Sequence, residues 1–210
     1  MLAGVIFDFD GVIVDSHPVH MQAWKTLFRS MGKAVGDEEL SFVMEGAKRE
    51  EILRRFLGDL TPEQIKLYGA EKEGLYQARA SELKLVCGVT EFLGQVEEAG
   101  VPIAVATSGS RNRVERTLDA FGLLKRFHTI VTAEDVARGK PDPALFHLAA
   151  RRLQVAADQI LVCEDAGADL LLLQFSPQLE EMERFSRQVI RTEVRTPVRA
   201  VEPRTLARAI

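Results

Sequence analysis

The stretch that decides the fold is LAGVIFDFDGV, which spans residues 2–12. Residues 2–9 form an almost unbroken apolar run rich in β-branched and aromatic side chains. Such a run is typical of a strand buried on both faces of a parallel sheet. Asp8 and Asp10 stand two residues apart at its end, so on an extended chain they point to the same face. We therefore expect two carboxylates to converge at the carboxyl end of this strand.

Three later runs have the same character and predict further strands, at residues 101–106, 129–133 and 159–163. Helical segments separate them, at residues 90–99, 113–121 and 144–153. Gly100 and Gly122 follow the first two helices in the position that favours a helix-ending glycine. Strands that alternate with helices predict an α/β fold with a Rossmann-like parallel sheet.

Residues 15–86 break this alternation, because they show helical periodicity and no convincing strand. Apolar residues recur at helical spacing over 21–31 and 50–57, and Thr61-Pro62-Glu63-Gln64 has the pattern of a capping box with proline at the first helical position. The sequence thus predicts a Rossmann-like catalytic core formed by residues 1–14 and 87–210. An inserted helical cap domain, residues 15–86, follows the first strand.

Polar residues follow each predicted strand, at the place where open α/β sheets bind ligands. After the second, third and fourth strands come, in order, Thr107-Ser108-Gly109, Lys140 and Glu164-Asp165. Hydroxyl and amide groups at a helix N-terminus suit a phosphate, and a lysine can offset its charge. Each motif alone could be an ordinary turn, helix cap or solvated lysine. All four in order indicate one shared site.

The acidic residues at these strand ends predict a metal site. Unpaired carboxylates against an apolar sheet would cost several kcal/mol or change their pKa values. A hard cation such as Mg²⁺ resolves this, since it takes carboxylate oxygens together with a substrate phosphate. The candidate ligands are Asp8, Asp10, Glu164 and Asp165.

Taken together, the motifs resemble those of the haloacid dehalogenase superfamily of phosphotransferases. The matching residues are DFDGV at 8–12, Thr107, Lys140-Pro141 and Glu164-Asp165, and the resemblance covers about residues 1–170. It implies that Asp8 is a nucleophile that forms an aspartyl-phosphate and that Asp10 is a general acid and base. It also implies Mg²⁺ as cofactor, held by Asp8, the backbone carbonyl of Asp10 and Asp165, with Glu164 close by. Thr107, Ser108, Gly109 and Lys140 would hold the phosphoryl oxygens.

The insertion resembles the helical cap of the β-phosphoglucomutase-like subgroup. The matching residues are Asp15-Ser16, His20, Ala23-Trp24-Lys25, the segment GAKRE at 46–50, and Lys72. The resemblance implies that His20, Trp24, Arg49 and Lys72 face the substrate. Other interpretations stay open: Trp24 suits the core of an amphipathic helix, His20 could be an interface residue, and Arg49 and Lys72 could be solvated.

Within this subgroup the implied activity is phosphatase or phosphomutase chemistry on a small, sugar-like phosphorylated metabolite. We favour the phosphatase, because the subgroup consists mainly of phosphatases. A phosphomutase of the β-phosphoglucomutase type is the alternative. A non-catalytic binding module is a further alternative, since a fold does not dictate a function.

Composition narrows the class of partner. The net charge of −4 leaves no overall basic field for nucleic acid. Cys87 and Cys163 lie far apart without a CxxC pair, which suits a reducing cytosol. The apolar run at the N-terminus is too short to span a membrane. We expect a cytoplasmic monomer or weak dimer that binds neither nucleic acid nor membrane.

The C-terminal tail departs from the family pattern. Seven arginines occur from Arg184 to Arg208, and no lysine follows Lys140. We expect a polar helix at residues 178–191 and an edge strand at 196–201. The tail is either a diverged surface segment or the product of a replaced sheet end, through divergence or a shifted reading frame. It could also contact an acidic partner or close a dimer, and its divergence puts activity in question.

Overall fold

The computed structural model of the protein describes residues 2–45, 48–140 and 142–164. Four parallel strands form a sheet in the order β5-β4-β1-β6. They are β1 (Gly4–Phe7), β4 (Ile103–Ala106), β5 (Thr129–Val131) and β6 (Ile160–Cys163). Val5 of β1 pairs with Ile103 on one side and Leu161 on the other. The predicted parallel sheet is confirmed, with each strand shorter than its apolar run.

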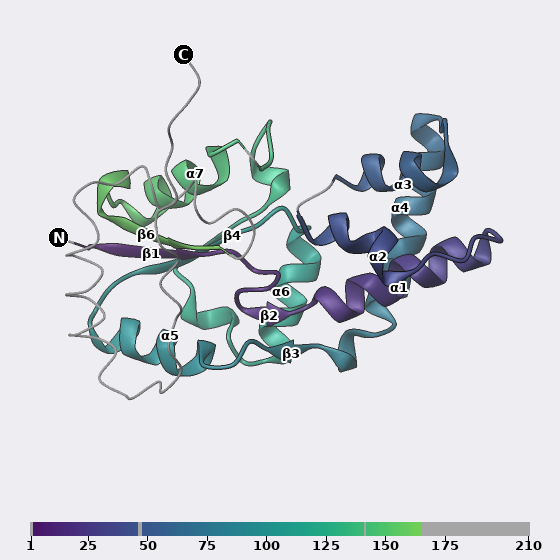
Figure 1. Cartoon of the computed structure of the whole chain (residues 1–210). Coiled ribbons are helices and arrows are strands. Elements are labelled where there is room, and N and C mark those ends of the chain that lie inside the picture. The colour runs from purple at the N-terminus through teal and green to yellow at the C-terminus, as the bar shows by residue number, and fades with distance from the viewer. Residues whose placement is uncertain (1, 46–47, 141, 165–210) are drawn as a thin grey trace, which may run out of the picture.

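Helices cover both faces of this sheet, as Figure 1 shows. α7 (Ala144–Leu153) lies on one face, and α5 (Val89–Glu98) and α6 (Arg111–Ala120) lie on the other. Side chains alternate between the faces along a strand. Val5 and Phe7 accordingly belong to the apolar core beneath α5 and α6, whereas Ile6 belongs to the core beneath α7. β1 is therefore buried on both faces, as its unbroken apolar run predicts.

The predicted helix boundaries are largely confirmed in the core. α7 spans the predicted residues, and the Asp142 carboxylate accepts the Ala144 amide at 2.9 Å before its first turn. Gly100 and Gly122 follow α5 and α6 with φ values of 67° and 69°. Glycine populates this left-handed region at no steric cost, which explains why both helices end there.

Residues between β1 and α5 form a separate group of helices, which lies beyond the carboxyl ends of the strands in Figure 1. The group comprises α1 (His17–Ser30), α2 (Asp37–Leu40), α3 (Arg49–Leu57), α4 (Pro62–Gln77) and the 3₁₀ turns η1 (Ser41–Glu45) and η2 (Ala80–Glu82). Trp24, Phe28, Leu40 and Leu53 belong to its own apolar core. The predicted capping box opens α4: Thr61 and Gln64 exchange hydrogen bonds of 2.9 and 3.3 Å.

A short antiparallel ladder joins this group to the sheet. β2 (Val14–Asp15) pairs with β3 (Lys84–Leu85), so the chain leaves for the helices and returns from them side by side. The expectation that residues 15–86 hold no strand is therefore wrong at Asp15 and at Lys84–Leu85. A strand of two residues is too short to produce a visible period of two.

Three further 3₁₀ turns complete the described elements: η3 (Leu124–Arg126), η4 (Ala133–Asp135) and η5 (Ala157–Gln159). None of the helices in the described ranges combines the length and apolarity that crossing a bilayer requires. The helix expected at residues 178–191 and the strand expected at 196–201 lie outside the described residues, as does the Arg-rich tail.

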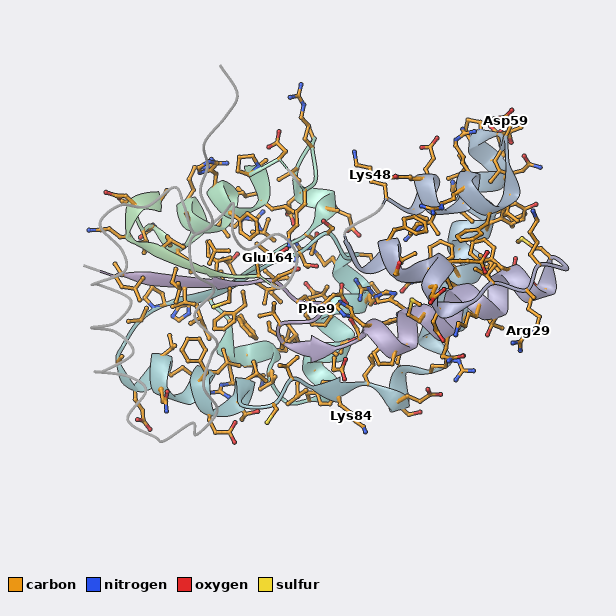
Figure 2. The ribbon with its side chains drawn as sticks, viewed as in Figure 1. Phe9, Arg29, Lys48, Asp59, Lys84 and Glu164 are labelled. Carbon is orange, nitrogen blue, oxygen red and sulfur yellow. The ribbon has the colours of Figure 1, made fainter. Side chains whose placement is uncertain are left out.

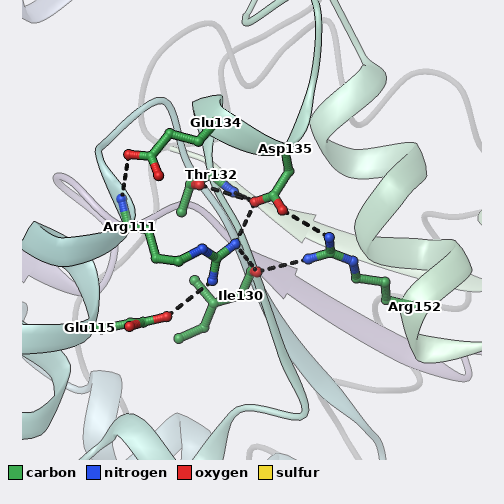
Figure 3. Close-up of polar contacts among 7 residues, drawn as sticks. All are labelled: Arg111, Glu115, Ile130, Thr132, Glu134, Asp135 and Arg152. Carbon is green, nitrogen blue, oxygen red and sulfur yellow. Dashed lines mark hydrogen bonds and ion pairs between the residues drawn. The ribbon is translucent and has the colours of Figure 1, made fainter.

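One ion-pair network connects three elements beside the sheet (Figure 3). The Asp135 carboxylate accepts hydrogen bonds from the side chain of Arg111 on α6, from Arg152 on α7 at 2.8 Å, and from the amide of Thr132 at 2.8 Å. Both arginines also donate to the Ile130 carbonyl of β5, at 3.2 and 3.1 Å. The network thus ties the first turn of α6 to the segment that leads into the Lys140 loop.

We expect Asp135→Ala to lower the free energy of unfolding by about 1.5–3 kcal/mol at pH 7, because it leaves charged donors without their acceptor. Burial alone would raise the pKa of Asp135, but hydrogen bonds from Thr132 and Arg152 and the charge of Arg111 lower it to about 2. A depressed pKa contributes stability above the pKa of the unfolded state. The difference between the two proteins should therefore shrink as the pH falls from about 5 towards 2.

Urea unfolding of the two proteins over this pH range measures the effect. Asp119→Ala is the matched control, because Asp119 is exposed on α6 and its carboxylate has no partner among the described residues. The control should change stability by less than about 0.5 kcal/mol. Equal effects of the two substitutions at pH 7 would contradict a stabilising role for the network.

Candidate active site

The polar residues that follow the strands gather at one edge of the sheet. Asp8 follows β1, Thr107 follows β4, and Glu164 follows β6. The carboxyl ends of parallel strands meet at the same edge, which explains why residues so far apart in sequence come together. In Figure 2, Phe9 and Glu164 lie near the junction between the sheet and α1–α4, whereas Arg29 and Asp59 lie towards the far end of those helices.

Asp8 is the centre of the first cluster. Its side chain is buried, and its Oδ2 lies 2.8 Å from the ammonium nitrogen of Lys140. The other oxygen, Oδ1, is buried without a hydrogen-bond partner among the described residues. Lys140 also donates to both oxygens of Glu164, at 3.0 and 3.1 Å. The sequence-predicted residues Asp8, Lys140 and Glu164 are therefore in mutual reach.

The charges of this cluster do not balance. Burial and the neighbouring Asp8 carboxylate raise the pKa of Glu164 to about 8, although Lys140 acts in the opposite direction. Two carboxylates thus compete for one ammonium, and Asp8 Oδ1 has no donor within the described chain. A divalent cation bound by oxygen ligands would relieve both features.

The remaining predicted ligands contribute in different ways. Asp165 lies outside the described residues, and the Asp10 carboxylate is engaged elsewhere, so Asp10 could supply only its backbone carbonyl. Within residues 2–45, 48–140 and 142–164, no three His, Cys, Asp or Glu side chains lie close enough together to hold a metal ion. The donor set fits a cation that also takes backbone and substrate oxygens.

The hydroxyl loop follows β4. Thr107 is buried, and its Oγ1 accepts the amide of Gly109 at 3.0 Å, which leaves the hydroxyl proton of Thr107 free to be donated. Ser108 is exposed. A Cβ at Gly109 would lie 2.4 Å from a guanidinium nitrogen of Arg113, so a side chain at this position would have to displace the guanidinium. The amide of Gly109, a predicted phosphate donor, is engaged by Thr107 in this structure.

Asp10 belongs to a second cluster, and no described contact joins its carboxylate to that of Asp8. Arg113 donates to both Asp10 oxygens, at 2.8 and 2.7 Å, and the Ser16 hydroxyl donates to Oδ1 at 2.6 Å. Nε2 of His20 lies 3.5 Å from the same oxygen. Burial opposes ionisation of Asp10, but Arg113 and His20 hold its pKa well below the usual value. Asp10 is thus an anion in this arrangement.

Sequence reasoning missed Arg113 as a site residue. The available signal was its position on α6: Arg113 and Val114 share a face with Thr117 and Leu118, one turn later, and all four are buried. An arginine on the buried face of an amphipathic helix requires an anionic partner. The pattern does not reveal which carboxylate provides it.

The predicted substrate-facing residues His20 and Lys72 contact each other. Lys72 Nζ lies 2.6 Å from His20 Nδ1, and the His20 ring stacks on Tyr76 with centroids 4.4 Å apart. Burial lowers the pKa of His20 to about 4, and burial with the charge of Arg113 lowers the pKa of Lys72 to about 7. An ammonium can only donate, so the neutral His20 ring accepts at Nδ1 and directs its Nε2 proton towards Asp10.

Trp24 and Arg49 lie less close to these clusters. Trp24 is buried in the apolar core of α1–α4, stacked on Phe28, and Lys72 Nζ lies 5.5 Å from its ring centroid. Arg49 is exposed, and its side chain packs against α4 at Gly69. A Cβ built on Gly69 would lie 2.7 Å from Arg49 Cδ. The packing of Trp24 agrees with the interpretation that it belongs to the core side of an amphipathic helix. Residues 46 and 47 of the matching GAKRE segment lie outside the described chain.

Comparisons with known proteins agree on one family. A family model described as haloacid dehalogenase-like hydrolase matches residues 5–172. Validoxylamine A 7'-phosphate phosphatase of Streptomyces hygroscopicus subsp. limoneus is 34% identical over 172 residues, which cover 79% of this chain and 78% of the relative. β-Phosphoglucomutase of Bacillus subtilis is 33% identical over 179 residues, covering 80% and 77%. The crystal structure of CbbY from Rhodobacter sphaeroides in complex with phosphate matches with a TM-score of 0.71 and 28% identity, over 81% of each chain.

We expect Lys72→Gln to raise the pKa of His20 from its value of about 4, because it removes a positive charge that lowers this pKa. The change should be upward but incomplete, since burial is the larger cause. Titration of the His20 ring by NMR measures it. Lys66→Gln is the matched control, because Lys66 is exposed on the same helix. A pKa of His20 that is the same in both variants would contradict the contact with Lys72.

Proposed function

We propose that this chain, which belongs to the haloacid dehalogenase-like hydrolase family, is a Mg²⁺-dependent phosphatase of a small, sugar-like phosphorylated metabolite. The observation that carries the proposal is the state of Asp8. One carboxylate oxygen is paired with Lys140, and the other is buried without a partner among the described residues. A carboxylate held in this way has one oxygen oriented by the lysine and one that no described hydrogen bond occupies, as a nucleophile requires. Relatives named as a phosphatase and as β-phosphoglucomutase support the substrate class.

In the first step Asp8 Oδ1 attacks phosphorus and forms an aspartyl-phosphate, while the bond from phosphorus to the leaving oxygen breaks. Asp10, which Arg113 and His20 hold as an anion in this structure, takes up a proton from solvent before this step and donates it to that oxygen. In the second step water attacks phosphorus, Asp10 accepts the proton of the water, and the bond to Asp8 breaks to release inorganic phosphate. Each step has a lower barrier than direct hydrolysis, because the covalent intermediate divides one difficult displacement into two easier ones.

Charge neutralisation is the main contribution of the other residues, as phosphoryl transfer requires. Lys140 contacts Asp8 and lies where it offsets the negative charge of an incoming phosphate. Thr107 keeps its hydroxyl proton for a phosphoryl oxygen, because Gly109 already donates to its oxygen. Asp8, Glu164, the Asp10 carbonyl and Asp165 are the groups that would hold Mg²⁺. When bound, the cation supplies charge neutralisation at the phosphoryl oxygens.

Residues 15–86 form the cap domain in this proposal, and they select the substrate. At the junction between these helices and the sheet, His20 contacts Asp10, and Lys72 contacts His20. The pKa of Lys72 is about 7, so its ammonium form predominates below neutral pH and can bind a substrate oxygen or phosphate there. Arg49 supplies a further positive charge on the same side of α4.

A phosphomutase is the second candidate, and a relative supports it: the β-phosphoglucomutase that is 33% identical. In that chemistry the phosphoryl group passes from Asp8 to a sugar hydroxyl instead of water, with Asp10 as the base for either acceptor. The same residues carry both reactions. The acceptor therefore depends on how well the cap excludes water.

We expect Asp8→Asn to reduce the hydrolysis of p-nitrophenyl phosphate by about 10³-fold or more, because the amide cannot act as the nucleophile. EDTA should abolish the activity of the unmodified protein, and excess Mg²⁺ should restore it. Asp119→Asn, on the exposed face of α6, should retain full activity. Substantial turnover by Asp8→Asn would overturn the assignment of the nucleophile, whereas a lack of turnover in every variant would favour the binding module.

A phosphatase should release inorganic phosphate from a panel of hexose and hexitol phosphates. It should form no glucose 6-phosphate from β-glucose 1-phosphate, because water reaches the aspartyl-phosphate. A coupled dehydrogenase assay measures glucose 6-phosphate, and a phosphate assay on the same samples measures inorganic phosphate. Conversion to the 6-phosphate faster than phosphate release would establish the mutase instead.

A further inference from the structure

Arg113 lies deep at the junction of sheet and cap. Its side chain is 5% exposed, and its two terminal nitrogens donate to the two oxygens of Asp10 at 2.8 and 2.7 Å. One of these nitrogens also lies 3.4 Å from the Tyr76 hydroxyl on α4. A single guanidinium therefore connects α6 of the core, the loop after β1 and a helix of the cap.

The packing around Arg113 fixes its orientation. Its guanidinium carbon lies 5.6 Å from the ring centroid of Phe9 and 5.1 Å from that of Tyr76. On a further side it is in close contact with the hydroxyl loop, where a Cβ at Gly109 would lie 2.4 Å from a guanidinium nitrogen. Two aromatic rings and a glycine thus restrict the Arg113 side chain, which could otherwise adopt several rotamers. These contacts restrict the guanidinium in addition to its hydrogen bonds with the carboxylate.

The other partners of Asp10 cannot fix it in the same way. Ser16 donates one hydrogen bond to Oδ1, and the His20 contact at 3.5 Å is longer and involves that same oxygen. Contacts to a single oxygen leave the carboxylate free to rotate about it. Of the described residues, Arg113 alone donates a hydrogen bond to Oδ2. A bidentate guanidinium–carboxylate pair fixes both the position and the plane of the carboxylate.

We propose that Arg113 is a positioning residue that orients the Asp10 carboxylate for proton transfer. The inference rests on the proposed function, in which Asp10 exchanges protons with the leaving group and with water. Arg113 acts through Asp10 and has no described contact with Asp8, Lys140 or Thr107. Substitution of Arg113 should therefore affect the chemical steps and leave Asp8, Lys140 and Thr107 in place, although Arg113 also packs against Gly109.

We expect Arg113→Lys to lower kcat for p-nitrophenyl phosphate by about 10- to 100-fold, since a misplaced catalytic group costs up to about 10²-fold. KM should change by less than about threefold. Lysine keeps the charge but donates from one nitrogen and cannot form the bidentate pair. Arg116→Lys is the matched control, because Arg116 is exposed one turn later on α6, and it should leave kcat unchanged.

A double-substitution cycle with Asp10→Ala separates positioning from general damage. When Asp10 is absent, Arg113→Lys should reduce the residual turnover by less than about twofold. The same 10- to 100-fold loss in both backgrounds would overturn the proposal, as would wild-type kcat in Arg113→Lys. Thermal unfolding of each variant identifies loss through instability. Failure of the proposed function has a different signature, because Asp8→Asn would then remain active.

Crystal structures of the wild-type protein and of Arg113→Gln provide a test that does not depend on activity. The Asp10 carboxylate should rotate out of its wild-type plane or be disordered in the variant, while Asp8 and Lys140 keep their contact. An Asp10 carboxylate that stays in place without the guanidinium would overturn the proposal. Movement of Asp8 and Lys140 together with Asp10 would overturn it also, since Arg113 would then support the whole site.

Discussion

The site depends on one ammonium group shared by two buried carboxylates. Lys140 lies 2.8 Å from Asp8 and 3.0 Å from Glu164, and these acids follow β1 and β6, which are neighbours in the sheet. The parallel arrangement forces their strand ends together, so the like charges meet whether or not a cation is present. One lysine cannot satisfy both, which raises the pKa of Glu164 and leaves Asp8 Oδ1 without a partner in the described chain. The fold thus creates an electrostatic deficit at the place where the proposed function requires a cation and a phosphate.

A second ion pair keeps Asp10 apart from this deficit. Had Asp10 also turned towards Lys140, three carboxylates would have competed for one ammonium, at a high desolvation cost. Arg113 prevents this by taking both Asp10 oxygens, and its own burial is compensated by the same pair. The two aspartates of the DFDG motif therefore have separate electrostatic environments. This separation suits the different roles proposed for them, one as a nucleophile and one as a proton carrier.

Much of the fold could be predicted from the sequence, because strong local patterns determine it. The apolar run before Asp8 becomes a doubly buried strand, and Asp142-Pro143 stands just before α7, whose predicted residues are observed. Prediction failed where the signal is too short or not local. β3 has only two residues. The Arg113–Asp10 and Lys72–His20 contacts join residues 103 and 52 positions apart, and no periodicity specifies such partners. The amphipathic pattern of α6 predicts that Arg113 is buried, but only the tertiary structure identifies Asp10 as its partner.

The contacts of Asp10 also relate its orientation to the attachment of the helices above the sheet. Ser16 directly follows β2, one of the two strands that join these helices to the core, and His20 lies on α1. Tyr76 of α4 contacts Arg113, which belongs to the core. Every described partner of the Asp10 carboxylate is therefore either part of the helical insertion or in contact with it. A displacement of the insertion relative to the sheet must change at least one of these contacts. Because of this connectivity, the orientation of Asp10 and the position of the helices cannot vary independently, whereas the Asp8–Lys140 pair is built from sheet-end residues alone.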